Sequence, residues 1–102
     1  MEKLSVFVTT FNNARTLREC LQSVAFADEL VVLDSHSSDD SEAIARAAGA
    51  TFIQHEFLGY GRQKQLALEH TSHRWVLFLD ADEVVSSTLA DELRALRDSD
   101  FH

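Results

Sequence analysis

The sequence predicts an α/β fold, a Rossmann-like open parallel sheet of about four strands with helices on both faces. Four apolar runs alternate with amphipathic stretches along the 102 residues. Within each apolar run, apolar and polar residues do not alternate one by one. Such continuous apolar runs are typical of strands in a parallel sheet that is buried on both faces. The chain contains no proline, and no repeat or low-complexity tract divides it, so residues 1–102 are expected to form one domain.

The first half of the chain begins with a strand and a helix. Residues 4–10, LSVFVTT, form the first apolar run. Apolar residues then recur at i, i+3, i+4 and i+7 over residues 17–24, the spacing of one helical face. Residues 30–33 are the second apolar run, which leads into Asp34.

A second helix and a third strand follow. Asp39, with Glu42 three residues later, has the form of a capping box in which Asp takes the place of Ser or Thr. The helix that it opens is expected to stop at Gly49, a residue type common just after helix ends. Residues 51–54 then form a short strand.

The last strand and two helices make up the rest. A loop containing Gly59 and Gly61 leads into a helix that runs to Glu69. Residues 75–79, WVLFL, are the most apolar segment and are expected to form a central strand. A serine, Ser86 or Ser87, caps a last helix that carries three leucines, Leu89, Leu93 and Leu96.

Composition excludes several classes of function. Hydrophobic residues make up 45%, an ordinary value for a globular domain, and no apolar run is long enough to span a membrane. The formal charge of −8 disfavours nucleic acid and anionic membranes as partners. Cys20 is the only cysteine and lies on an apolar helical face, so it is expected in the core of a cytoplasmic protein.

Polar side chains follow three of the predicted strands. The first strand ends in Thr-Thr-Phe-Asn-Asn at residues 9–13, the second in Asp-Ser-His-Ser at 34–37, and the fourth in Asp-Ala-Asp-Glu at 80–83. Ligands of open α/β sheets bind beyond the carboxyl ends of the strands. We therefore expect a site there, with the first strand beside the fourth so that Asn12 and Asp82 meet.

Two carboxylates stand directly after the most apolar strand. Asp80 and Asp82, at i and i+2, can face the same ligand, one toward a metal and one toward a hydroxyl. Helix capping is the structural alternative, but serines are already available for that. For Glu83, support of the site and simple solvation stay open.

The first turn lacks the glycines of a dinucleotide-binding fingerprint, and no P-loop is present. The pattern therefore favours a nucleotide whose phosphates are held by a metal. Asp34 is a candidate nucleotide contact, with duty in the turn beside Ser35 and Ser37 as the alternative. Arg62 and Lys64, at a helix start, could bind a diphosphate or be solvated charges.

Three segments resemble the N-terminal half of family-2 glycosyltransferases with a GT-A fold. They are LSVFVTTFNNARTLRECLQSV, ADELVVLDSHSSDDSEAIA and WVLFLDADE, and GYGRQKQLAL is similar to a segment of bacterial transferases that add a hexose to the lipopolysaccharide core. The resemblance implies one role for each of eight residues and a divalent metal, Mn²⁺ or Mg²⁺. Thr9, Thr10 and Asn12 would line the pocket for the base and the ribose, and Asp34 would contact the base. Asp80 would bind the ribose, Asp82 would bind the metal, and Arg62 or Lys64 would lie near the phosphates.

The resemblance also implies limits. The family's turn after the second strand carries glycines where this chain has His36 and Asp40, so both are expected to need backbone angles open to L-residues. The family's catalytic base and acceptor-binding segment would follow the last helix, so the catalytic residues are unknown. Residues 1–102 would be the nucleotide-sugar-binding domain, inactive alone, prone to self-association through uncovered apolar surface, and peripheral at the inner membrane in a longer parent.

Two other functions compete with a transferase that uses a nucleotide-diphosphate sugar and a glycan or lipid-linked acceptor. Asp80-x-Asp82 after an apolar strand also resembles the first motif of haloacid-dehalogenase-type phosphatases, although in those enzymes the motif opens the fold. The third candidate is a non-catalytic nucleotide-binding or assembly module.

Overall fold

The computed structural model describes residues 3–98 and contains four strands that alternate with four helices. In chain order the elements are β1 (Leu4–Thr10), α1 (Ala14–Ser23), β2 (Glu29–Asp34), α2 (Ser41–Ala47), β3 (Thr51–Gln54), α3 (Tyr60–His70), β4 (Trp75–Asp80) and α4 (Ser87–Asp98). This is the predicted α/β alternation. None of the helices in the described part of the chain is both long and apolar enough to cross a bilayer.

The four strands form one parallel sheet in the order β3-β2-β1-β4, which confirms that the first strand lies beside the fourth. Thr10 on β1 is paired with Asp34 on β2, and Thr9 is paired with Asp80 on β4. The carboxyl ends of these three strands therefore meet at one edge of the sheet.

The expectation of a central position for the most apolar strand is wrong. Within the described chain β4 pairs only with β1, so it lies at the sheet's edge, and the side chain of Phe78 is 39% exposed. The interior strands are β1 and β2, and six of the seven residues of β1 are buried. No residue of β4 is buried, so the apolar composition of a strand fixes neither its burial nor its number of neighbouring strands in this sheet.

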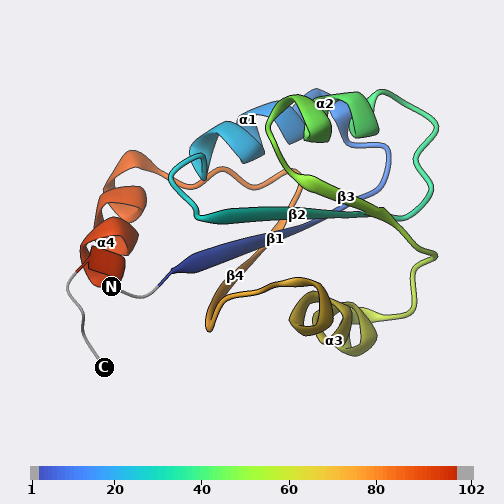
Figure 1. Ribbon diagram of the computed structural model, residues 1–102. Coiled ribbons are helices and arrows are strands. Elements are labelled where there is room, and N and C mark those ends of the chain that lie inside the picture. Colours follow the sequence, from blue (N-terminus) through green and yellow to red (C-terminus); the bar gives the residue numbers. More distant parts are fainter. Residues whose placement is uncertain (1–2, 99–102) are drawn as a thin grey trace.

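Helices cover the two faces of the sheet unequally. Figure 1 shows α1 and α2 on one face, α3 alone on the other, and α4 beside the N-terminal end of β1. The larger core joins alternate residues of the strands to α1, among them Val6, Val8, Leu17 and Leu21. A smaller core beneath α3 is built from Phe7, Val31, Leu33 and Ala67. One helix closes the second face, so that face stays open near β4.

Two predicted helix ends are confirmed. Gly49 adopts φ +80°, and Ala50 N–H donates to the carbonyl of Ala45 at 3.0 Å, which closes α2 with the pattern of a Schellman motif. At the start of α4, Leu89 N–H donates to Ser86 Oγ at 3.1 Å, so Ser86 is the capping serine.

The predicted leucine face of α4 is only partly correct. Leu93 packs against the core and Ala90 is buried, but Leu89 and Leu96 are 43% and 45% exposed. Because α4 lies beside the end of the sheet, it buries a narrower stripe than a helix lying across a sheet would.

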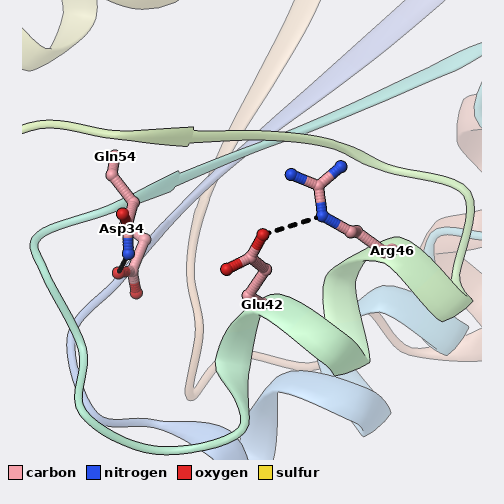
Figure 2. A network of polar contacts seen from close by, with 4 residues as sticks. All are labelled: Asp34, Glu42, Arg46 and Gln54. Atoms are coloured by element: carbon pink, nitrogen blue, oxygen red, sulfur yellow. Dashed lines mark hydrogen bonds and ion pairs between the residues drawn. The ribbon is translucent and has the colours of Figure 1, made fainter.

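The predicted capping box does not form. Helix α2 begins at Ser41, whose hydroxyl and backbone N–H both donate to Oδ1 of Asp39. The Oδ2 atom of Asp39 accepts the N–H of Ala14 at 3.0 Å. Asp39 thus joins the starts of α1 and α2. Glu42 instead forms an ion pair with Arg46 one turn later, at 2.9 Å (Figure 2).

The turn after β2 departs from the expected backbone. His36 adopts φ 62° in the left-handed region, as does Asn12 at φ 51°, whereas Asp40 is right-handed at φ −83°. The expectation is therefore wrong for His36 and correct for Asp40. The two left-handed turns support each other, since Asn12 N–H donates to Ser37 Oγ at 2.7 Å.

Candidate functional site

A cavity of about 300 Å³ lies where the carboxyl ends of β1 and β4 meet the start of α3. Polar side chains from these elements and from the two turns that follow β1 and β2 line much of its wall, namely Thr9, Thr10, Asn13, Ser35, Gln63, Asp80 and Asp82. The prediction of a site at this edge of the sheet therefore coincides with a cavity, and four of the eight predicted residues line it: Thr9, Thr10, Asp80 and Asp82.

The two predicted carboxylates face this shared space. Both side chains are exposed and line the cavity. Asp80 is held from two directions: Thr9 Oγ1 donates to its Oδ1 at 3.0 Å, and its own N–H donates to Glu83 Oε1 at 2.8 Å. Glu83 N–H in turn donates to the Asp80 carbonyl at 2.9 Å. Glu83 therefore shapes the turn that presents the acidic pair.

The charge of this turn acts on a neighbouring thiol. Cys20 is fully buried, as expected, and burial raises its pKa to about 11, with further upward contributions from the charges of Glu83, Asp82 and Asp80. The three carboxylates thus create a negative potential around the end of β4. Such a potential attracts cations.

The carboxylates of Asp80 and Asp82 suit a cation only when other ligands complete its coordination. Among residues 3–98 no three His, Cys, Asp or Glu side chains come together as a metal cluster. Asp80 and Asp82 supply the oxygen atoms that hard divalent cations prefer, and Mg²⁺-type ions are commonly held by one or two carboxylates plus substrate phosphates. The residues fit a metal of that kind.

Asp34 carries out the turn role that the sequence left open. It is fully buried, and it accepts hydrogen bonds from the backbone and hydroxyl of Ser37 and from Gln54 Nε2 at 3.3 Å (Figure 2 shows the Gln54 contact). The expected ligand contact of this residue is a direct one between Asp34 and a nucleoside. That contact stays a prediction.

Three other predicted residues lie away from this cavity. Asn12 faces the turn after β2, where its Oδ1 accepts Ser38 N–H at 2.9 Å. Lys64 lines a second cavity of about 220 Å³, and its Nζ lies 5.9 Å from the centre of the Phe78 ring. Arg62 is exposed on α3 and lines neither of these two cavities. Phosphate contacts from α3 therefore stay predictions.

Sequence reasoning missed the aromatic part of the wall. Phe11, Phe57 and Tyr60 line the cavity and are 57%, 56% and 77% exposed. Phe57 and Tyr60 meet edge to face with ring centres 5.4 Å apart. The signal available in the sequence was the pair of aromatic residues Phe57 and Tyr60 on either side of Gly59.

Gln63 was also missed, although it stands between the two basic residues that were considered. It is 4% exposed and lines both cavities. Its spacing of four from the buried Ala67 places it on the inner face of α3, and that spacing is visible in the sequence.

Curated relatives of the chain include glycosyltransferases. An uncharacterized glycosyltransferase of Rickettsia felis is 43% identical over 94 residues, which cover 91% of this chain and 33% of the relative. The lipopolysaccharide core biosynthesis glycosyltransferase LpsC of Rhizobium meliloti is 35% identical over 98 residues, covering 91% and 36%. The chain thus spans about a third of the length of these relatives.

Solved structures show the same architecture. The glucosyl-3-phosphoglycerate synthase of Mycobacterium tuberculosis, in complex with Mn²⁺, uridine diphosphate and glucosyl-3-phosphoglycerate, matches with a TM-score of 0.75 and 28% identity, over 95% of this chain and 40% of that one. TarS of S. aureus matches with a TM-score of 0.74 and 30% identity, over 92% and 32%. The sequence model of glycosyl transferase family 2 matches residues 5–100. The order of strands, the acidic turn after β4 and these matches agree: the chain belongs to glycosyl transferase family 2.

Proposed function

We propose that this chain binds a nucleotide-diphosphate sugar, a UDP-hexose, through a divalent cation at the acidic turn. The observation that carries the proposal is the joint presence of Asp80, Asp82 and exposed aromatic rings in one cavity at the carboxyl ends of the strands. Carboxylates suit a cation that neutralises a diphosphate, and aromatic faces suit a base. A structural neighbour solved with Mn²⁺ and uridine diphosphate supports this choice of ligand.

Each element of the site then has a role. Thr9 and Thr10, with Phe11, receive the nucleoside, and Asp80 binds a ribose hydroxyl. Asp82 holds Mn²⁺ or Mg²⁺, which supplies positive charge to the diphosphate when bound. Arg62 or Lys64 of α3 lies near the phosphates. Asn12 lines the base and ribose pocket while its Oδ1 holds the turn after β2, and Asp34, which supports the same turn, contacts the base.

The acceptor is proposed to be a glycan or lipopolysaccharide-core saccharide, on the support of the relative named for lipopolysaccharide core biosynthesis. We further propose that a segment outside these 102 residues supplies the acceptor site and the catalytic base, since the relatives are about three times as long. Transfer needs a base within reach of the acceptor's proton, and Asp80 and Asp82 are committed to the ribose and the metal. Without that segment we expect slow hydrolysis of the donor at most. The proposed location of the protein is the cytoplasm.

The proposal is tested by calorimetric titration of the purified chain with UDP, with and without Mn²⁺. The Asp82→Ala variant should lose the Mn²⁺-dependent part of the affinity, because it removes the proposed ligand. Glu92→Ala, which removes an exposed carboxylate from α4, is the matched control and should bind as the wild type does. Retention of the full Mn²⁺ effect in Asp82→Ala would show that the metal assignment is wrong.

The same preparation separates the competing functions. The family match favours a transferase over the phosphatase alternative, and a generic phosphate ester should accordingly not be hydrolysed. Consumption of a UDP-hexose distinguishes residual catalysis from a module that only binds. Robust transfer by the 102 residues to members of an acceptor panel would contradict the proposed need for a further segment.

A further inference from the structure

Gln63 carries a polar atom that the protein itself leaves without a partner. The residue is 4% exposed, and its Oε1 is buried with no hydrogen-bond partner among the described residues. Buried polar atoms are nearly always paired, because they lose water on folding and weaken the fold unless a new partner replaces it. An unpaired amide oxygen in a cavity wall therefore suggests a partner that arrives with a ligand.

The position of Gln63 indicates which part of a ligand it would meet. The two cavities at this edge of the sheet share four wall residues, Thr9, Tyr60, Gln63 and Asp80. The first cavity continues toward Asn13 and Ser35 at the ends of β1 and β2, and the second continues under α3 toward Phe78. Gln63 thus shares the junction of the two cavities with Asp80, the residue proposed to bind the ribose.

The second cavity has the composition of a sugar site. Its wall combines the partly exposed ring of Phe78 with the ammonium of Lys64 and the carboxylates of Asp80 and Glu83. An aromatic face offers contact to the C–H groups of a sugar ring, and the charged groups and the amide of Gln63 offer partners to its hydroxyls. An amide both donates and accepts, as does a sugar hydroxyl.

We propose that Gln63 is a specificity-determining residue that binds a hydroxyl of the donor's hexosyl group, which lies in the second cavity. This inference rests on the proposed binding of a UDP-hexose in the first cavity. It adds that the amide of Gln63 distinguishes the sugar-bearing donor from the bare nucleotide. Lys64 and Phe78 line the same cavity as Gln63.

The test compares UDP with UDP-glucose, UDP-galactose and UDP-N-acetylglucosamine, each titrated calorimetrically into the chain with Mn²⁺. Wild type should bind at least one UDP-hexose more tightly than UDP. Gln63→Leu, of similar volume, should weaken binding of that hexose donor about tenfold and leave UDP binding within about twofold, since one hydrogen bond to the hexose is lost. Gln65→Leu changes an exposed glutamine on the same helix and should leave both affinities unchanged.

Several outcomes would overturn the inference. If Gln63→Leu weakens the binding of UDP and of the UDP-hexose equally, the amide contacts the nucleotide and not the hexose. If the binding of both is unchanged, the amide does not contact the donor. A wild type that binds UDP but prefers none of the three UDP-hexoses would mean that the second cavity is not a hexose site. Failure of the wild type to bind UDP at all would refute the proposed function and this inference with it. Gln63→Met, judged by the same outcomes, replaces Gln63→Leu if thermal unfolding shows that the leucine variant does not fold.

Discussion

Thr9 and Asp80 are directly paired across β1 and β4, and the hydroxyl of Thr9 donates to Oδ1 of Asp80 at 3.0 Å. The pairing joins residues 71 positions apart in the chain and sets the direction in which the first carboxylate of the acidic turn points. One side chain of a central strand thereby orients a side chain of an edge strand.

Loss of this hydroxyl should weaken nucleotide binding. Thr9→Val keeps the β-branched shape that suits a strand but removes the donor, so we expect UDP affinity with Mn²⁺ to fall about three- to tenfold. Thr9→Ser restores the hydroxyl and should recover most of the affinity. Thr51→Val, at an exposed position on β3, is the control, and a similar loss there would argue against an orienting role for Thr9.

Asp34 should contribute to stability more than its neighbours in the same turn. Asp34→Ala removes the acceptor for Ser37 and Gln54, and we expect the free energy of unfolding in urea to fall by about 2–3 kcal/mol. Asp40 is exposed and makes no side-chain cap hydrogen bond, so Asp40→Ala should change stability by less than about 0.5 kcal/mol. Equal effects of the two substitutions would contradict the assigned role.

Asp39 should make the stability of the chain depend on acid pH. The hydrogen bond from the Ser41 hydroxyl, with those from backbone N–H groups including that of Ala14, holds the pKa of Asp39 below its ordinary value. A carboxyl whose pKa is lowered by folding stabilises the fold above its unfolded pKa of about 4, and this contribution disappears as the pH falls through the folded value.

The comparison is between wild type and Asp39→Asn, unfolded in urea at a series of pH values. The destabilisation caused by Asp39→Asn should be largest near neutral pH and should shrink once the pH drops below about 4. A difference between the two proteins that stays constant across this range would show that the charge of Asp39 is not involved.

Cys20 should be unreactive in the folded chain. Its thiol is fully buried, and its pKa of about 11, raised by burial and then by the neighbouring carboxylates, leaves little thiolate near neutral pH. At pH 8 we expect labelling with a thiol reagent to be slower in the native protein than in urea by roughly a hundredfold or more. Rapid labelling of the native chain would indicate that α1 opens away from the sheet.

The sequence by itself determined the elements and the edge of the sheet at which the site lies. Apolar runs with helical spacing between them predict every strand and helix, because period and burial are local properties of a chain. The acidic pair Asp80 and Asp82 was visible for the same reason: it directly follows an apolar strand, and parallel strands end at a common edge. Gly49 and Ser86 were predictable from helix-end chemistry.

Only the tertiary structure decided which polar residues face the cavity and which serve the fold. Asp34, Asp39 and Asn12 have the residue types of ligand-binding groups, and all three also bond within the fold. Asp34 accepts from Ser37 in its own turn and from Gln54 on β3. Asp39 accepts from Ala14, and Asn12 Oδ1 accepts from Ser38, both across about 25 residues of chain. Gln63 is the opposite case, since its amide lacks the partner that burial requires. Whether a polar side chain is satisfied depends on atoms brought close by packing, and this information is absent from the local pattern of the sequence.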